Sequence, residues 1–245
     1  MKPQTWMSAA LFIELAALAA LSPGLARADD MQDDMHEHMH MHEHAGHDHA
    51  AHAMPVPTSL EPASAAVTLS RKPLSDQDGH VLRLKDDVVG DRIVVVGFVY
   101  TNCTAVCPVV SSIFSELQAK LGSRLDKDVR LVSMTVDPAR DTPSRLKSYA
   151  AQYDAKPGWL WLTGSRGNVT EALKGFGAYT ANYENHPLIV LIGDGKSGQW
   201  SRHYGLSGSE PLLAQVDEFL AARAKLQDKS GDKMAAMRMA ADGHF

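Results

Sequence analysis

The chain contains only two cysteines, Cys103 and Cys107, which stand four positions apart. They follow a strongly apolar run at 93–99 and precede a run of helical periodicity that we expect to begin at Pro108. The N-terminus of a helix carries partial positive charge, which favours thiolate over thiol. Thiolates bind soft metals and attack disulfides. The pair therefore predicts a metal site or a redox site.

A structural disulfide is the other interpretation of this pair, and it depends on the compartment. The N-terminus resembles an export signal, with Lys2, an apolar run at 7–21, and the small-residue pattern of Ala26-Arg27-Ala28. Glu14 disfavours a membrane-spanning helix, although an uncleaved anchor is the alternative to a cleaved signal peptide at 1–28. We therefore expect a periplasmic protein in an oxidising compartment, where disulfides form. A disulfide across so short a loop would stabilise the fold little, so we favour a functional pair.

A biased tract follows the signal at 29–54 and contains seven acidic residues without a lysine or arginine. Such a composition cannot build a core, and we expect it to remain disordered without metal. Imidazole suits Cu(II) and thioether suits Cu(I), so the interspersed histidines and methionines predict metal capture, with copper as the expected metal. The candidate auxiliary ligands are His36, His38, His40, His42, His44, His47, His49 and His52.

The rest of the chain is close to electrically neutral and has no basic stripe with interleaved aromatic residues. This argues against nucleic acid as a partner. We expect a monomer with a linker up to residue 64, one folded domain at 65–226, and a flexible methionine-containing tail at 227–245.

The domain alternates segments with strand and helix patterns, which indicates an α/β fold. Asp78-Gly79 predicts the turn of a hairpin within 73–84, and Thr142 is a candidate cap for a helix beginning at Pro143. The further strands are expected at 93–99, 129–136, 159–162, 188–192 and 199–204, and the helices at 108–121, 143–153, 168–176 and 209–225. In an α/β sheet the loop that follows a strand lies at the strand's C-terminal edge, which places the cysteines there.

Three local runs resemble the Sco/SenC family of copper-binding proteins. Residues 100–108 are similar to that family's Cys-x-x-x-Cys-Pro loop. Residues 136–143 resemble its Asp-Pro-x-Arg-Asp-Thr-Pro segment, and residues 159–164 resemble its Trp-x-x-Leu-Thr-Gly strand. The resemblance covers roughly 67–224 and implies a thioredoxin-like fold, with a central mixed sheet, helices on both faces and an N-terminal β-hairpin.

The resemblance also implies a ligand set of Cys103, Cys107 and a distant histidine, which here is His186. The family commonly has Asp-His-Ser at that place, whereas this chain has Asn185-His186-Pro187. Two thiolates and an imidazole form a soft set that suits Cu(I) and can hold Cu(II) with added ligands, and zinc would usually need a fourth ligand. Pro187 is a candidate cis-proline that would direct His186 towards the cysteines.

By resemblance, the function would be that of an exported copper chaperone, not an enzyme. It would deliver copper to the binuclear copper centre of cytochrome c oxidase, with the copper-bearing subunit or another copper chaperone as partner. The alternative is a thiol-disulfide reductase that keeps a partner's copper-ligand cysteines reduced, with Cys103 and Cys107 as the redox pair. In either case a thioredoxin-like reductant would serve as an electron donor. Peroxidase activity and pure metal buffering are weaker alternatives.

Other candidate residues lie outside this ligand set. We expect His80 and His203 at the surface, because each lies in or near a predicted turn. Asp137 could lie beside the metal site, but the pattern favours a turn organised by Asp137, Arg140 and Asp141 among themselves.

Overall fold

The structure is a computed structural model that describes residues 62–242, with side-chain environments up to Ser230. The strands are β1 (Ala63–Ser64), β2 (Leu74–Ser75), β3 (Val81–Leu82), β4 (Ile93–Val99), β5 (Val129–Thr135), β6 (Trp159–Leu162), β7 (Ile189–Asp194) and β8 (Trp200–Tyr204). The α-helices are α1 (Val106–Leu121), α2 (Pro143–Ala151), α3 (Arg166–Phe176) and α4 (Ser209–Asp242). Shorter turns of helix are η1 (Leu84–Val89), η2 (Gly122–Arg124) and η3 (Tyr183–Asn185).

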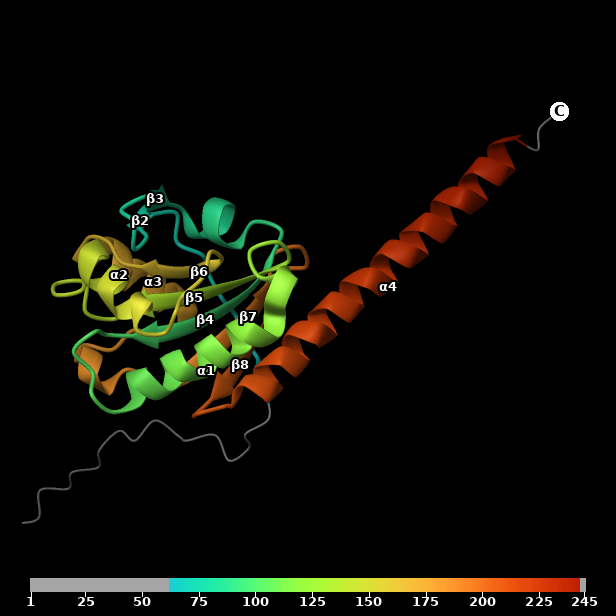
Figure 1. The fold of residues 1–245 in the computed structure, drawn as a ribbon. Coiled ribbons are helices and arrows are strands. Elements are labelled where there is room, and N and C mark those ends of the chain that lie inside the picture. Colours follow the sequence, from blue (N-terminus) through green and yellow to red (C-terminus); the bar gives the residue numbers. More distant parts are fainter. Residues whose placement is uncertain (1–61, 243–245) are drawn as a thin grey trace, which may run out of the picture. The chain divides into compact units, whose positions relative to one another are not determined.

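The main sheet has the order β1-β8-β7-β4-β5-β6. β4 runs parallel to β5 and β5 parallel to β6, whereas β7 is antiparallel to β4 and β8 is antiparallel to β7. β2 and β3 form a separate antiparallel hairpin, with Gly79 in the left-handed conformation that its turn requires. This arrangement confirms the expected thioredoxin-like fold with a mixed sheet and an N-terminal hairpin (Figure 1).

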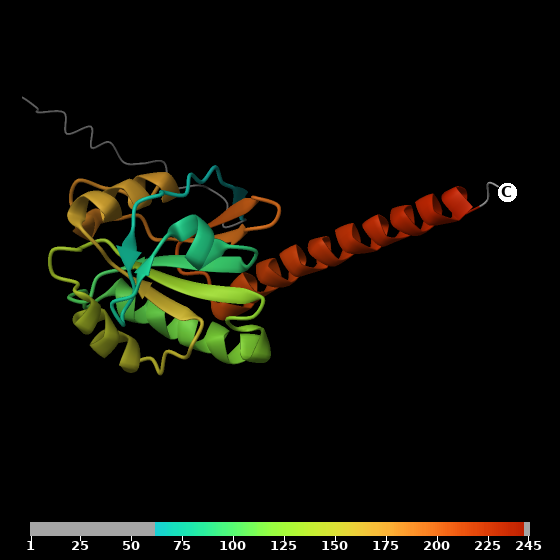
Figure 2. The same ribbon diagram turned by 90° about the horizontal axis from the view of Figure 1, so that it is seen from above.

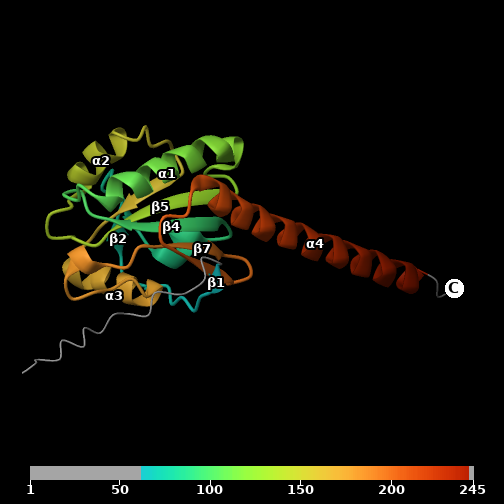
Figure 3. The same ribbon diagram turned by 90° about the horizontal axis from the view of Figure 1, so that it is seen from below.

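The sheet is buried on both faces because two hydrophobic clusters cover it. Residues of α1, α2 and α4 pack on one face, and residues of α3 and η1 pack on the other. Figures 2 and 3 show these layers from two opposite sides. All seven residues of β4 are buried, which explains its continuous apolar sequence without alternation. β4 is thus the central strand, and it ends directly before the cysteine loop.

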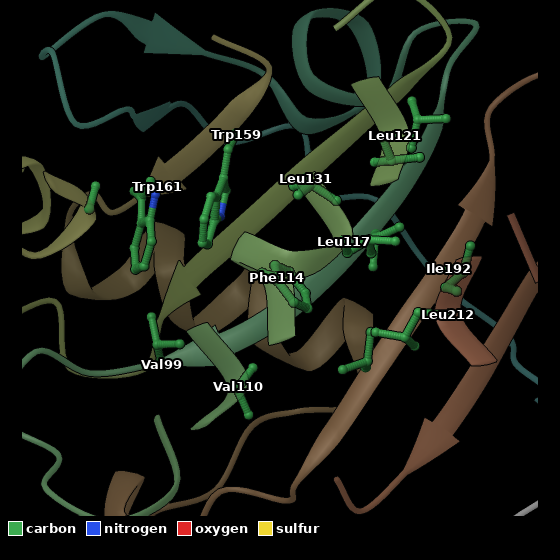
Figure 4. Packing of buried hydrophobic residues seen from close by; sticks show 14 of the residues in the cluster. Val99, Val110, Phe114, Leu117, Leu121, Leu131, Trp159, Trp161, Ile192 and Leu212 are labelled. Atoms are coloured by element: carbon green, nitrogen blue, oxygen red, sulfur yellow. The ribbon is translucent and has the colours of Figure 1, made fainter. Parts of the chain in front are cut away.

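α1, which follows the cysteine loop, packs closely against the sheet. A Cβ atom added to Gly97 of β4 would lie 2.9 Å from the ring of Phe114, so the glycine leaves the space that this ring occupies. Phe114 lies 6.0 Å from the ring centroid of Trp159, which stacks on Trp161 at 5.0 Å (Figure 4). The buried indole Nε1 of Trp159 donates to Ser133 Oγ at 3.0 Å, so this large side chain leaves no unsatisfied donor.

Three boundaries differ from those expected from the sequence. α1 begins at Val106, two residues before Pro108. Pro108 fits inside the first turn because the amides there have no intrahelical partner, so the missing N–H of proline costs no hydrogen bond. The last helix extends past Lys225 to Asp242. β1 pairs with β8, so the sheet begins within the segment assigned to the linker. Other elements agree with the prediction to within about three residues, and Thr142 caps α2 through the amide of Arg145.

A membrane-spanning helix would need a long apolar segment, and none of the helices in residues 62–242 provides one. The predicted signal peptide and the histidine-rich tract lie outside the described residues.

Candidate metal and redox site

The cysteine loop is a short connection between the buried strand β4 and the first turn of α1. The amide of Cys103 donates to the Tyr100 carbonyl at 3.1 Å, which closes a turn just after the strand. Cys107 lies inside α1, and its amide donates to Cys103 Sγ at 3.4 Å. The sulfur of Cys103 therefore accepts a hydrogen bond at the N-terminus of the helix, the position that stabilises a thiolate.

Both cysteines are free thiols and are buried, with exposed fractions of 7% for Cys103 and 1% for Cys107. Burial opposes ionisation of Cys103, but hydrogen bonds from Cys107, from the Ala105 amide and from Tyr100 outweigh it and lower the pKa of Cys103. Burial, reinforced by the hydrogen bond to Cys103, raises the pKa of Cys107 to about 12. The pair is therefore unequal: Cys103 is the thiolate-forming partner and Cys107 the proton-retaining one.

Tyr100 connects the cysteines to the loop that carries His186. Burial, and then the interaction of its hydroxyl with the Cys103 thiol, raise the pKa of Tyr100 to about 12. Its ring contacts Tyr183 edge-on at 5.2 Å and His186 edge-on at 6.1 Å between centroids. The sequence interpretation missed Tyr100, and its one signal was a polar aromatic residue directly between a buried strand and the cysteines.

His186 lies at the same edge of the sheet, between η3 and β7. The end of β4 has a neighbouring segment on each side. On one side Val136 N donates to Val99 O, and on the other Leu188, two residues after His186, leads into β7, which pairs antiparallel with β4. The imidazole is half-buried, and this burial lowers the pKa of His186. A neutral imidazole is the form that can donate electrons to a metal ion. Its Nδ1 lies 3.2 Å from the Pro187 carbonyl oxygen.

The three candidate ligands share one region but do not converge to coordination distance. The ligand atoms of Cys103, Cys107 and His186 do not all lie within 4.8 Å of one another. The idea of a cis-proline that directs His186 towards the cysteines is wrong, because no peptide bond between residues 62 and 242 is cis. Joint ligation therefore requires the imidazole and the thiols to come closer together.

The turn after β5 differs from its interpretation from sequence. Asp137 and Arg140 do organise it: the Asp137 carbonyl accepts from the amides of Arg140 and Asp141, and Arg140 lies 3.7 Å from the Asp137 carboxylate. Asp141, however, does not serve only its own turn. Its carboxylate accepts hydrogen bonds from Thr101 in the cysteine loop, a contact that joins residues forty positions apart.

His80 and His203 have different environments. His80 is exposed, as expected, and its Nδ1 lies 3.0 Å from the Asp76 carboxylate, which raises the pKa of His80. The expectation for His203 was wrong, because it is only 2% exposed. It pairs with Val190, which lies in the hydrophobic cluster that includes α4, and burial lowers the pKa of His203. The nearby turn gave no sign of this burial, because the cluster is assembled from elements far apart in the sequence.

One further group of candidate ligand atoms occurs in the described part of the chain, formed by Asp76, Asp78 and His80. Its carboxylates already have partners: Asp76 accepts from the amides of Asp78 and His80, and Asp78 lies 2.8 Å from Lys147 Nζ. This group is therefore the hydrogen-bonded turn of the hairpin. The eight histidines of the auxiliary tract lie outside the described residues.

Comparisons with known proteins match the domain that carries these residues. A family model described as SCO1/SenC matches residues 70–192, which is half of the chain. The "SCO1 protein homolog" of Bacillus subtilis is 34% identical over 131 residues, which cover 49% of this chain and 66% of that protein. A "putative copper-binding protein" of Stutzerimonas stutzeri is 35% identical over 133 residues, which cover 50% and 64%. The chain thus spans just under two thirds of the length of these relatives.

A solved structure gives the same result for the fold. The protein called BsSco, described as a member of the Sco family of cytochrome c oxidase assembly proteins with a disulfide switch, has a TM-score of 0.54 at 25% identity. The match covers 65% of this chain and 97% of that one. The matched residues include the cysteine loop, the turn after β5 and His186. This chain belongs to the SCO1/SenC family.

Proposed function

We propose that this protein is an exported copper chaperone that binds one copper ion through Cys103, Cys107 and His186. The observation that carries the proposal is the pair of free thiols at a helix N-terminus, one with a lowered pKa, at the same sheet edge as a half-buried neutral imidazole. This soft donor set fits Cu(I), and copper-binding relatives in the same family support the choice of metal. Copper is here the cargo, to be handed over by ligand exchange.

The geometry also supports a hand-over, because the three ligands are not fixed together in advance. The buried thiols would hold copper first, and His186 would join when its imidazole comes within coordination distance. A site that can gain or lose its only nitrogen ligand changes its preference between Cu(II) and Cu(I). By its family membership, we propose cytochrome c oxidase, with its binuclear copper centre, as the destination, reached directly or through another copper chaperone.

Copper titration of the reduced full-length chain tests this proposal. We expect one tight site in competition with a Cu(I) chelator, and its loss in Cys103→Ser and in Cys107→Ser. His186→Ala should weaken Cu(II) binding more than Cu(I) binding. The matched control is His80→Ala, which removes an exposed imidazole from the hairpin and should leave the tight site unchanged. Full affinity in both serine variants would refute the chaperone role.

The unequal thiols favour thiol-disulfide reduction as a second candidate function. Here the Cys103 thiolate attacks a sulfur of a partner's disulfide, and the departing partner sulfur leaves as a thiolate. Cys107 then attacks the mixed disulfide, which releases the reduced partner and leaves Cys103 and Cys107 oxidised. A thioredoxin-like donor must supply two electrons to restore the pair. This chemistry does not require His186, so His186→Ala separates the two functions: it should weaken copper binding and leave dithiol reduction intact.

The acidic histidine-rich tract is proposed as an auxiliary metal-capture segment. Its eight histidines within 36–52 would bind further metal ions more weakly than the thiol site. The export signal at 1–28 would bring both sites into the periplasm, where copper is handed over.

A further inference from the structure

Asp141 is a buried carboxylate that joins the cysteine loop to the end of β5. It is only 1% exposed. One oxygen accepts from the Thr101 hydroxyl at 2.6 Å, the other accepts from the Thr135 hydroxyl at 2.5 Å, and both lie within 3.3 Å of the Thr101 amide. Within the described part of the chain, no lysine, arginine or histidine forms an ion pair with it. Its negative charge is therefore stabilised by neutral donors alone.

The position of these donors explains what the carboxylate does. Thr135 is the last residue of β5 and pairs with Val99, the last residue of β4. One more backbone hydrogen bond, from Val136 N to Val99 O, extends the pairing of β4 with β5. Beyond it the segments that follow the two strands are no longer paired. Thr101 lies two residues beyond Val99, where no strand remains to hold it. At this position the Asp141 carboxylate joins the two segments through hydrogen bonds from Thr101 and Thr135, in place of backbone hydrogen bonds between strands.

We propose that Asp141 is a positioning residue that anchors the cysteine loop by bridging Thr101 to Thr135. Burying a carboxylate without a cationic partner is costly, so a residue with this arrangement is poorly explained as a contribution to stability alone. An anchor two residues before Cys103 limits how far the loop can open, while Cys107 is held independently by α1. The anchor therefore acts on Cys103, the thiolate-forming member of the pair.

The test uses the reduced, copper-free, full-length chain and four variants. Asp141→Asn removes the charge and weakens the bridge; Thr101→Val removes one hydroxyl bond and keeps the shape. Thr101→Ser retains the hydroxyl and should behave like the parent. Asp137→Asn is the matched control, because this carboxylate lies in the same turn and accepts no hydrogen bond from the cysteine loop. The measurements are amide hydrogen exchange at Thr101 and Cys103, and the rate of Cys103 alkylation across pH.

We expect exchange at both amides to rise about tenfold in Asp141→Asn, as expected for weakening a hydrogen bond to a charged group. The limiting alkylation rate of Cys103 should rise severalfold in Asp141→Asn and in Thr101→Val. It should not change in Thr101→Ser or Asp137→Asn. Unchanged exchange and alkylation in Asp141→Asn, even with a lower melting temperature, would overturn the proposal, as would equal effects of Thr101→Val and Thr101→Ser. If Asp141→Asn does not fold, the two threonine variants decide the matter alone.

A copper-dependent measurement rests on the proposed chaperone function. In the Cu(II)-loaded protein, Asp141→Asn should change the thiolate-to-copper absorption band, and Thr101→Ser should not. If the parent chain binds no copper, the chaperone function fails while the exchange and alkylation results still judge the anchor. If copper binds normally and exchange is unaffected by Asp141→Asn, the anchor fails and the chaperone function stands.

Discussion

At the scale of single residues, the two thiols have opposite tendencies although they share one loop. Cys103 accepts a hydrogen bond from the Cys107 amide and has a lowered pKa, whereas Cys107 is the more deeply buried of the pair. Hydrogen bonds to a thiolate lower its pKa, and burial without such bonds raises it. The order of reaction is therefore set by the loop: the Cys103 sulfur ionises first, and the more deeply buried Cys107 sulfur keeps its proton.

This difference predicts the pH profile of alkylation of the reduced chain. Cys103 should react with iodoacetamide at pH values below the ordinary range for a cysteine thiol, because its folded pKa is lowered. Cys107 should stay unreactive up to strongly alkaline pH, because its pKa is about 12. Mass spectrometry of peptides from the alkylated parent chain assigns each rate. Equal rates at neutral pH would contradict the assignment of roles.

Tyr100 allows a sharper version of the same test. Tyr100→Phe removes the hydroxyl that contributes to the lowered pKa of Cys103 and keeps the ring that contacts Tyr183 and His186. The alkylation midpoint of Cys103 should move to higher pH, because one stabilising donor to the thiolate is lost. Tyr153→Phe is a control, since that hydroxyl bonds Tyr149 instead of a cysteine. A midpoint that does not move in Tyr100→Phe would exclude the hydroxyl as a tuning group.

At the scale of elements, α4 is attached to the sheet by a buried ion pair at the far edge from the cysteines. Arg223 donates to the Asp194 carboxylate, with Nε at 3.0 Å, and both side chains are largely buried. Burial opposes ionisation of Asp194, but bonds from Arg223, Lys196 and Ser197 outweigh it and lower the pKa of Asp194. The first turns of α4 pack in the same cluster as Val190 of β7, so this pair helps to keep the helix on that face of the sheet.

Breaking the pair should destabilise the domain. Arg223→Ala should lower the free energy of unfolding by about 3–5 kcal/mol, because it leaves a buried carboxylate unpaired. Arg124→Ala removes an exposed partner of Asp217 and should cost at most about 1 kcal/mol. Urea unfolding of both variants measures the difference. Equal losses would mean that the buried pair holds α4 no better than a surface contact.

The same pair predicts how stability depends on pH. The folded-state pKa of Asp194 is lowered, so its contribution is present above the pKa that this residue has in the unfolded chain. That contribution is lost as the pH falls through the lowered folded-state value. In Asp194→Asn this part of the acid dependence should be absent, although the variant is less stable at neutral pH. Urea unfolding at a series of acidic pH values measures how steeply the free energy of unfolding falls with pH in the parent chain and in Asp194→Asn.

At the scale of the whole molecule, the sheet gathers several segments at one edge. β1 runs antiparallel to β8, so the N-terminal end of β1 lies at the edge where β8 ends and β7 begins. Gly205 N donates to Leu188 O at 2.9 Å at this edge, close to His186 in sequence. The chain therefore enters the domain at the edge that carries the cysteine loop, the turn after β5 and His186.

Deletion of residues 29–54 should lower the number of metal ions bound and keep the single tight site. Histidine binds metal as neutral imidazole, so the additional binding should fade below about pH 6. Metal counting on the full-length and shortened chains, at neutral and mildly acidic pH, measures the difference. Equal stoichiometry would show that the tract has no role in capture, and it would leave the thiol site untouched.

The sequence by itself determined the elements and the reactive pair. Ile93–Val99 is wholly apolar because β4 is buried on both faces, and Thr142-Pro143 starts a helix through local capping. Cys103 and Cys107 are close in sequence, so their shared loop at a helix N-terminus followed from local pattern alone. These features depend on neighbours within a few residues, which is why the sequence was sufficient.

Only the tertiary structure decided which distant residues act on that pair. Asp141 reaches Thr101 across forty positions, and Tyr100 meets His186 only because β7 lies antiparallel beside β4. His203 is buried beside Val190, which packs in the same hydrophobic cluster as the distant helix α4. Such contacts arise from strand order and from the packing of helices on the sheet. These long-range contacts cannot be predicted from the spacing of residues along the chain.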